Sequence, residues 1–249
     1  ATTQTIFFLF IQVMFCGTAV TILAGAIAER VKFGAYLFLA FIGATITYPI
    51  FGHWVWNGIN IGEKGGWLGQ LGFVDFAGSS VVHSVGGWIS LAVLLVVGAR
   101  TGRFPKGKPA QKIPGSDVPL ATLGVMILWF GWFGFNAGST LGMNDQVPRV
   151  MVNTVIASSA GMVGALAIGW FIRGRAEIDL VLNGVLAGAV AITANCHAVS
   201  TASAVFIGVV GAGVMLLVDN LLIRLKIDDA VGAIPVHLAA GIWGTLAVG

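Results

Sequence analysis

The chain has 249 residues, of which 57% are hydrophobic and 9% are charged. Soluble domains carry about 25% charged residues, and 13 basic plus 10 acidic side chains are too few to cover a water-soluble globule of this length. The composition excludes cytosolic enzymes and soluble binding modules and predicts a protein whose solvent is the lipid bilayer. The net charge of +3 does not indicate nucleic-acid binding, because the basic residues lie in connections between apolar stretches.

A helix that spans the bilayer needs about 20 mostly apolar residues. Eight stretches approach or reach this length, at residues 5–28, 33–52, 76–98, 119–138, 150–172, 180–195, 202–223 and 231–249. The sixth stretch is short and contains Gly184 and Gly188 in a small-xxx-small pattern, which is typical of close helix packing. The sequence therefore predicts an all-α, polytopic membrane bundle.

The basic residues alternate between the connections and so predict the orientation, because positive charge is retained on the cytoplasmic side. One set of connections holds 11 of the 13 basic residues, and only Lys64 and Arg149 lie in the other set. The 11 are Arg30, Lys32, Arg100, Arg103, Lys106, Lys108, Lys112, Arg173, Arg175, Arg224 and Lys226. This division predicts that both ends of the chain lie outside, and that residues 99–118 form a cytoplasmic connection.

Two histidines lie in matching surroundings in the third and eighth stretches. Around His83 and His237, four positions match: Asp75 and Asp229, Gly78 and Gly232, Val82 and Val236, and Gly87 and Gly241. The charge pattern sends the third stretch inward and the eighth outward, so the motif crosses the membrane in opposite senses, which indicates an inverted-topology repeat. We expect one transmembrane domain, with residues 1–98 in the first repeat and residues 119–249 in the second.

The depth of the two histidines predicts that their side chains meet. Eight residues at 1.5 Å put each about 12 Å from its own membrane surface, which leaves about 6 Å between them in a core of roughly 30 Å. An ionisable residue inside a span indicates function, although a hydrogen-bonded core histidine is the alternative. Asp75 and Asp229 are expected to cap the helices that follow them, and Asp75 could also draw cations inward.

Several other polar and aromatic residues have two interpretations each. Trp54 and Trp56 suit an interfacial aromatic belt, but with Ser139 an aromatic wall could instead bind a small cation. His53 and His197 are expected at the interface or in solvent, and Asp219 is expected to pair with Arg224 or to line the exit. The two cysteines, Cys16 and Cys196, support neither a disulfide framework nor a thiolate metal site.

Five motifs along the chain resemble the ammonium transporter family (Amt/Mep, distantly the Rhesus proteins). They are GAIAERVKF at 25–33, GHWVW at 52–56, VDFAGSSVVH at 74–83, WFGFNAGS at 132–139 and the GAIPVH that ends at residue 237. Members carry eleven spans, in two inverted five-helix bundles plus one helix, and form trimers with a pore in each protomer. The resemblance runs from end to end and implies that this chain corresponds to spans three to ten, so we expect it to be a fragment of a protein in the cell inner or plasma membrane.

The resemblance also implies roles for individual residues. It implies a pore and proton relay at His83 and His237, a gate at Phe15 and Phe135, and recruitment of ammonium at Trp56 and Ser139 beside Phe15. The carboxylate typical of the family falls on Asp75. Two departures concern Ile11, where many bacterial members have a second outer phenylalanine, and residues 194–203, which differ from the usual pattern.

The function that the sequence favours is transport of ammonium or ammonia without enzymatic activity, cofactor or metal. Outer NH4⁺ would be recruited, deprotonated and conducted as NH3 past the two histidines. The resemblance implies a homotrimer and leaves room for a cytoplasmic regulator. The first alternative is an ammonium sensor of the same fold coupled to a signalling domain. The second is a membrane cytochrome in which His83 and His237 bind a haem.

Overall fold

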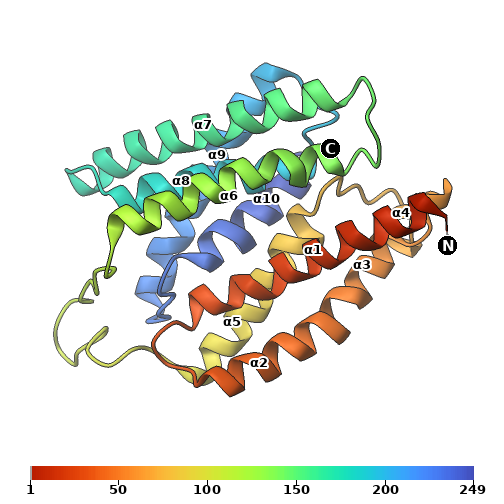
Figure 1. The fold of residues 1–249 in the computed structure, drawn as a ribbon. Coiled ribbons are helices and arrows are strands. Elements are labelled where there is room, and N and C mark those ends of the chain that lie inside the picture. The colour runs from red at the N-terminus through yellow and green to blue at the C-terminus, as the bar shows by residue number, and fades with distance from the viewer. Residues whose placement is uncertain (1) are drawn as a thin grey trace.

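The computed structural model describes residues 2–249, and in this range the chain forms helices and connections (Figure 1). The first part contains α1 (Thr3–Ala26), α2 (Phe33–Ile42), η1 (Gly43–Thr47), α3 (Tyr48–Trp56), η2 (Ile59–Ile61), α4 (Trp67–Gln70), η3 (Ser79–Ser84) and α5 (Val85–Val97). The second part contains α6 (Val118–Gly138), α7 (Val147–Arg173), α8 (Ile178–Thr193), α9 (Thr201–Arg224), η4 (Ile234–Ala239) and α10 (Ala240–Leu246). Three of these, η1, η3 and η4, are π-helical turns continuous with the α-helices beside them.

Among the described residues, six helices are long and apolar enough to cross a bilayer. They run over Thr3–Ala26, Phe33–Ile61, Ser79–Val97, Val118–Gly138, Val147–Arg173 and Thr201–Arg224. Two shorter apolar helices, Ile178–Thr193 and Ile234–Leu246, coincide with the sixth and eighth predicted stretches. The chain is therefore an all-α, polytopic membrane bundle, as predicted, and two of the eight stretches form helices shorter than a full span.

The first and second parts of the chain form two groups of helices that meet along the middle of the molecule. In Figure 1, α1, α2, α3 and α5 lie together on one side, α6 to α9 on the other, and α10 between them. The groups contact each other where η3 packs against η4 and α10, and where α5 packs against η4. Figure 1 also shows α5 and α10 running in opposite directions, as an inverted repeat requires.

Small residues bring α7, α8 and α9 into close contact. A side-chain carbon at Gly188 would collide with the carbonyl oxygen of Ala157, and one at Gly184 would collide with Ala165. Gly208 of α9 approaches the same Ala157 carbonyl. The close helix packing predicted from the small-xxx-small pattern of the sixth stretch is therefore confirmed, because only glycine allows these backbones to approach so closely.

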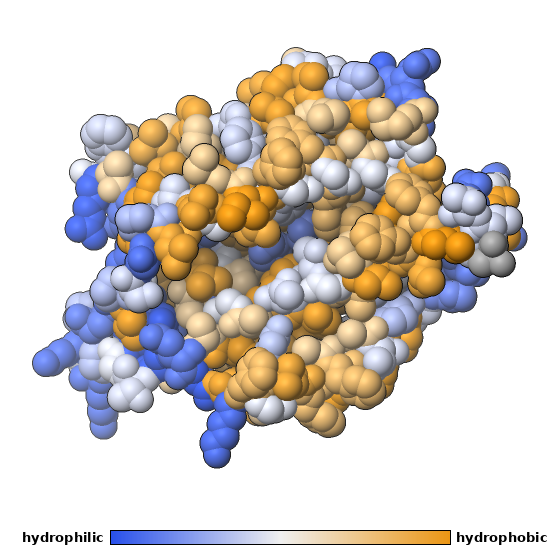
Figure 2. Space-filling model, in the orientation of Figure 1, coloured by the Kyte–Doolittle hydropathy of each residue, from blue (hydrophilic) through white to orange (hydrophobic). Residues whose placement is uncertain are grey.

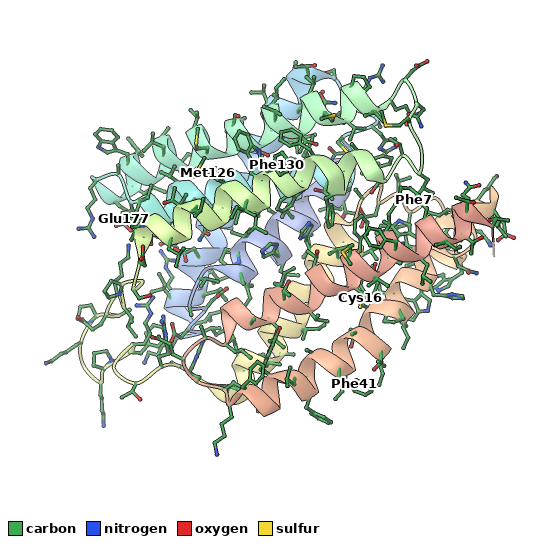
Figure 3. All side chains as sticks on the ribbon, viewed as in Figure 1. Phe7, Cys16, Phe41, Met126, Phe130 and Glu177 are labelled. Atoms are coloured by element: carbon green, nitrogen blue, oxygen red, sulfur yellow. The ribbon has the colours of Figure 1, made fainter. Side chains whose placement is uncertain are left out.

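The outer surface of the bundle is apolar in the middle and charged at its ends. Phe41, Met126 and Phe130 are exposed on the flanks of α2 and α6 (Figure 3). The space-filling view shows a broad hydrophobic surface over α1 and α6, with hydrophilic groups gathered at the two ends (Figure 2). This distribution suits a lipid environment, where large apolar side chains need no cover.

An ion-pair cluster joins the basic connections at one end of the bundle. The carboxylate of Asp228, between α9 and η4, lies 2.8 Å from Arg100, 3.3 Å from Arg103 and 3.6 Å from Arg30. Burial by itself raises the pKa of Asp228, but the hydrogen bonds and charge of Arg100, together with the charge of Arg30, hold it below its usual value. Two separate connections are thus fixed to one buried carboxylate, which belongs to a third.

A second cluster surrounds Glu177, at the start of α8 (Figure 3). Its carboxylate lies 3.0 Å from both Lys112 and Arg173 and 3.1 Å from Arg175. Burial by itself raises the pKa of Glu177, but these cations, with the hydrogen bonds from Lys112 and Arg175, lower it to about 2. The predicted pairing of Asp219 with Arg224 is wrong. Asp219 lies 2.7 Å from Arg173, because the neighbouring helix presents an arginine at the same level.

Candidate functional site

The turn that carries His83 begins with a glycine and an aspartate cap. Gly78 has a φ of +111°, a conformation that only glycine adopts without strain. One oxygen of Asp75 accepts hydrogen bonds from the backbone N–H groups of Gly78 and Ser79, both at 2.9 Å. The other accepts from Ser80 and Val81, both at 2.8 Å. The carboxylate thereby satisfies the free N–H groups at the start of the helix.

The turn that carries His237 begins in the same way. Gly232 has a φ of +79°, and the carboxylate of Asp229 accepts hydrogen bonds from Gly232 at 3.1 Å and Ile234 at 2.6 Å. Pro235 lies in the first turn, where its missing N–H costs no hydrogen bond. The matching sequence positions therefore have matching local structure, and each histidine lies in a π-helical turn.

The two imidazole rings lie against each other at the centre of the bundle. The Nδ1 atoms of His83 and His237 are 3.1 Å apart, and the rings stack with centroids 5.2 Å apart and planes inclined by 19°. His83 is 1% exposed, and its Nε2 is buried without a hydrogen-bond partner. At this separation one ring nitrogen can donate a proton to the other, so the pair can hold or pass a proton.

The two histidine-bearing segments cross at the glycines that follow the histidines by four residues. A side-chain carbon at Gly87 would lie 2.6 Å from Cβ and 2.8 Å from the backbone nitrogen of Leu238, the residue after His237. One at Gly241 would lie 2.5 Å from the hydroxyl of Ser84, the residue after His83, and would collide with the carbonyl oxygen of Ser79. Each glycine thus makes room for the backbone of the opposite segment.

Phe15 of α1 and Phe135 of α6 are stacked, with ring centroids 4.1 Å apart and planes inclined by 22°. Trp56 lies on one side of this pair, 5.8 Å from Phe15. His83 lies on the other side, 5.4 Å from Phe135. The rings of Trp56, Phe15, Phe135, His83 and His237 therefore form a continuous series from the end of α3 to the middle of the bundle.

The two tryptophans at the end of α3 have different environments. Trp56 is 7% exposed, and its indole N–H donates a 2.7 Å hydrogen bond to the backbone oxygen of Asp75. Trp54 is 40% exposed and packs edge-on against Trp67, with ring centroids 5.7 Å apart. Trp54 thus has the position of a surface anchor, whereas Trp56 is part of the interior.

Of the remaining sequence-predicted residues, Ser139 and Ile11 lie near these rings. Ser139 follows Phe135 by one helical turn, and its hydroxyl donates a 3.0 Å hydrogen bond to the Phe135 carbonyl rather than to another helix. Ile11 packs against the cluster that contains Phe15 and Trp56. His53 is exposed, whereas His197 stacks on Phe76 with ring centroids 4.4 Å apart.

Two contacts at this site involve residues to which the sequence analysis gave no role. Trp132 stacks on His83, with centroids 5.0 Å apart and planes inclined by 15°, and its indole donates to the hydroxyl of Thr193 at 2.9 Å. Tyr48 donates a 2.7 Å hydrogen bond to the side-chain oxygen of Gln12. Trp132 is the first residue of the WFGFNAGS motif, but its distance from His83 depends on how α6 packs against η3.

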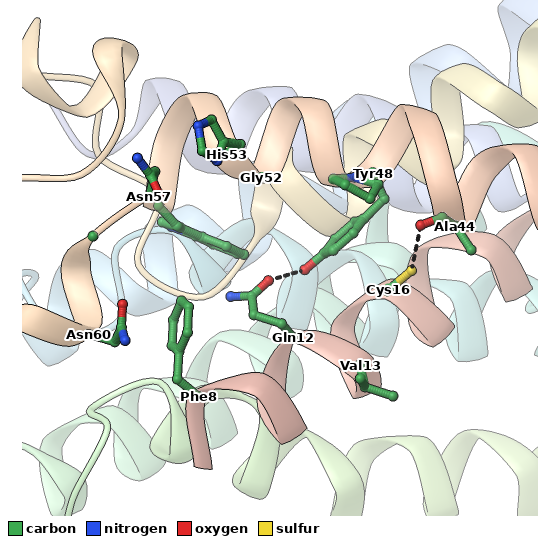
Figure 4. A pocket seen from close by; sticks show the side chains of 13 residues that line it. Phe8, Gln12, Val13, Cys16, Ala44, Tyr48, Gly52, His53, Asn57 and Asn60 are labelled. Carbon is green, nitrogen blue, oxygen red and sulfur yellow. Dashed lines mark hydrogen bonds between the residues drawn. The ribbon is translucent and has the colours of Figure 1, made fainter. Parts of the chain in front are cut away.

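A cavity of about 350 Å³ opens between α1 and α3, beside Trp56 (Figure 4). Its walls combine apolar side chains with polar groups from both helices and from the segment that follows α3. The polar groups belong to Gln12, Cys16, Tyr48, His53, Asn57 and Asn60. The hydrogen bond from Tyr48 to Gln12 crosses the cavity from one helix to the other.

The stacked histidines do not fit the cytochrome alternative. Two axial nitrogens with bonds of about 2 Å to one metal would lie about 4 Å apart, on opposite sides of a porphyrin. The Nδ1 atoms here are 3.1 Å apart, at hydrogen-bond distance, and the ring planes are inclined by 19°. Gly87 and Gly241 hold the surrounding backbones in contact, which leaves no slot for a macrocycle.

Comparison with known proteins gives concordant matches in sequence and structure. The family model described as Ammonium Transporter Family matches residues 1–249. Ammonium transporter Amt2 of Archaeoglobus fulgidus is 42% identical over 251 residues, which cover 96% of this chain and 52% of that protein. Ammonium transporter Amt1 of the same organism is 38% identical over 247 residues, which cover 99% of this chain and 60% of that protein.

Solved structures agree. A structure titled "Sensor Amt Protein" superposes with a TM-score of 0.92 at 45% identity, covering 97% of this chain and 60% of that one. Mep2 of Saccharomyces cerevisiae superposes with a TM-score of 0.85 at 31% identity, covering 95% and 52%. The chain spans about half the length of the curated relatives it matches. Sequence and fold together establish that this chain belongs to the ammonium transporter family.

Proposed function

We propose that the protein carries ammonium across a membrane by recruiting NH4⁺ at Trp56, Phe15 and Ser139, and by conducting NH3 past His83 and His237. The family is one of membrane transporters rather than enzymes. The observation that carries the proposal is the continuous ring series, with neighbouring centroids 5.8, 4.1, 5.4 and 5.2 Å apart. It joins a candidate cation site to a candidate proton relay.

Recruitment would depend on the faces of the aromatic rings. A cation within about 6 Å of a ring face is attracted by about 0.5–2 kcal/mol, depending on its desolvation. Trp56 and Phe15 provide two such faces at an angle of 52°. Ser139 would add a hydrogen bond by turning its hydroxyl away from the Phe135 carbonyl. The backbone oxygen of Asp75 accepts the hydrogen bond of the Trp56 indole, and the carboxylate of the same residue would add negative charge near the site.

Deprotonation follows from the apolar surroundings. Moving a bare NH4⁺ into an apolar passage costs more in lost hydration than two ring faces return. NH4⁺ therefore passes the gate of Phe15 and Phe135 and gives one proton to His83, whose ring follows Phe135, and neutral NH3 continues past the histidines. The proton moves separately through the two imidazoles, whose Nδ1 atoms are 3.1 Å apart. NH3 and the proton recombine on the inner side, so one positive charge crosses in each cycle.

The test is an ammonium pulse applied to the full protein in proteoliposomes, with the current recorded. We expect a saturable current in the wild type and an altered flux or selectivity for Phe15→Ala and Phe135→Ala, with little loss of folded protein. Normal flux and selectivity in both variants would exclude the gate. Saturable uptake of ammonium without any current would show that passage is neutral and would remove the proton relay.

The sensor alternative makes the opposite prediction, because a sensor binds ammonium without a sustained flux. The curated relatives quoted above are named transporters, which favours transport. Binding of ammonium with no flux in proteoliposomes would reverse that choice. We also propose that the protein forms homotrimers, with both ends of this segment on the outer side. Native mass spectrometry and labelling of single cysteines placed at Thr2 and Lys108 test these two points.

A further inference from the structure

One hydrogen bond joins the helix that carries Phe15 to the helix that carries Trp56. Tyr48, at the start of α3, is 4% exposed, and its hydroxyl donates to the side-chain oxygen of Gln12 in α1 at 2.7 Å (Figure 4). A buried phenol needs such a partner, because an unsatisfied hydroxyl in an apolar setting is costly. The bond therefore fixes the two side chains to each other.

Few other polar contacts hold these helices together. Among the described residues, the only other hydrogen bond between α1 and the helix formed by η1 and α3 runs from the thiol of Cys16 to the Ala44 carbonyl, at 3.6 Å. A thiol is a weak donor. The remaining contacts are apolar and non-directional, so they allow the helices to slide. The Tyr48–Gln12 bond is thus the directional element that sets their register.

The register of these helices determines the distance between the rings. Gln12 precedes Phe15 by three residues, and Tyr48 precedes Trp56 by eight residues, which is about 12 Å along a helix. Tyr48, Phe15 and Trp56 all belong to one buried cluster with Val81 and Val82. A change in the packing of α1 against α3 would therefore move Phe15 relative to Trp56, whose indole is held separately by Asp75.

We propose that Tyr48 and Gln12 are positioning residues that set the spacing between Phe15 and Trp56, and hence the size of cation that fits between them. This inference rests on the proposed function. A cation held by both rings must lie within about 6 Å of each ring centre, and the centres of Phe15 and Trp56 are 5.8 Å apart and tilted by 52°, so the spacing of the rings sets whether one cation reaches both. A small increase would weaken binding of NH4⁺ and favour a larger cation such as methylammonium.

The experiment compares Tyr48→Phe with wild type, with ammonium and methylammonium as probes and with half-saturation and maximum current measured separately. We expect the half-saturating ammonium concentration to rise about 3- to 10-fold, which corresponds to the loss of one hydrogen bond. The maximum current should stay within about twofold, and the preference for ammonium over methylammonium should narrow. A role in folding alone would lower the maximum current at unchanged half-saturation, and that result overturns the proposal.

Thr45→Val is the matched control. Thr45 lies one turn before Tyr48, and its hydroxyl bonds only to the Phe41 carbonyl of its own helix, at 2.7 Å. It also loses one hydroxyl, but no bond between helices, so half-saturation should not change. An equal shift in Thr45→Val and Tyr48→Phe would overturn the positioning role.

The double variant tests whether the two residues act through one bond. Gln12→Leu should reproduce the shift of Tyr48→Phe, and the double variant should be no worse than either, because residues that share one interaction are not additive. Additive shifts would overturn the proposal. Trp56→Leu, measured alongside, separates the positioning role from the proposed cation site. A change in half-saturation in Trp56→Leu but not in Tyr48→Phe rejects only the positioning role. No change in either variant rejects the outer cation site itself.

Discussion

The turns that carry His83 and His237 have the same backbone and different supports. Both start from an aspartate cap and a left-handed glycine, and both continue as π-helical turns. The His83 turn is held from outside by an uncharged group, the indole of Trp56, which donates to the Asp75 carbonyl. The His237 turn is held by charges, because the residue before its cap, Asp228, binds three arginines.

The difference also extends to the rings. His83 is fully buried and stacks on Trp132, whereas His237 is partly exposed. The comparison shows that a short motif can specify the position of a side chain. The residues packed around the motif then determine how exposed the side chain is and how firmly it is held. The variants below test two statements: that the two turns place their histidines in equivalent positions, and that different contacts hold the two turns with different strength.

The largest expected effect concerns the charged support. Asp228→Asn leaves Arg30, Arg100 and Arg103 close together without their common carboxylate, and breaking a buried ion pair from one side costs about 3–5 kcal/mol. The matched change at the uncharged support, Trp56→Phe, removes one hydrogen bond, worth about 1 kcal/mol, and part of a buried ring, so we expect a smaller loss of about 2 kcal/mol. Denaturant unfolding in detergent measures both. Equal losses would contradict the unequal support of the two turns.

The same support predicts a dependence on pH. The pKa values of Asp228 and Glu177 are lower in the folded protein than in model peptides. Their contribution to stability is therefore complete above about pH 4.5 and is lost as the pH falls toward the folded values. Wild-type stability should drop between about pH 4.5 and 2, and Asp228→Asn should show a shallower drop. An unchanged slope would mean that Asp228 does not contribute.

The second effect concerns the rings themselves. If both imidazoles relay the proton, His83→Ala and His237→Ala should each lower the ammonium-dependent current about 100-fold, the scale of losing a general acid–base group. His83→Ala should also lose more stability, because that ring is buried against Trp132. Currents recorded in proteoliposomes, with gel filtration to verify folding, test this. Wild-type currents in both variants would remove the relay.

The third effect tests the equivalence of position. Gly87→Ala and Gly241→Ala both push a methyl group into the backbone of the opposite turn, so both should destabilise the protein by about 1–3 kcal/mol. Gly213→Ala is the control, since its added carbon would meet only Ile168, at 3.9 Å. The midpoint of thermal unfolding measures all three. A large loss at only one crossing glycine would show that the turns do not cross symmetrically.

The smallest effect concerns the candidate cation site. Trp56→Leu should raise half-saturation about 2- to 30-fold, the range expected for losing one ring face worth about 0.5–2 kcal/mol. Trp54→Leu, at the exposed neighbour, should change it little. Equal and small shifts in both would assign Trp56 to structural packing and remove it from the site.

Length and hydropathy alone predicted the helices, because the bilayer forces about 20 apolar residues into each span. Their boundaries were less accurate. The third stretch was expected to begin at residue 76, but the helix begins at Ser79, since Asp75 must first cap the free N–H groups and Gly78 must first turn the chain. The π-helical turns were not predicted either, because one added residue in an apolar helix leaves no mark in the hydropathy pattern.

The pairing of His83 with His237 could be predicted because depth along a helix follows from residue counting. The stacking of Trp132 on His83 and the bond from Tyr48 to Gln12 could not, because they depend on the rotation of one helix against another. Asp219 illustrates the same limit: the nearest arginine in sequence is Arg224, but the nearest in space is Arg173. Counting residues along a helix gives the depth of a side chain in the membrane. It does not say which residue of a neighbouring helix that side chain contacts.

The crossing of Gly87 and Gly241 has a consequence for motion. Backbone in contact with backbone cannot separate without moving whole helices, which takes microseconds to milliseconds, whereas the stack of Phe15 and Phe135 can change by rotation of side chains alone. The backbone that sets the distance between the two imidazoles therefore moves slowly. The stacking of Phe15 on Phe135 can change faster. The proposed gate at Phe15 and Phe135 can therefore move without any change in the backbone contact that sets the histidine pair.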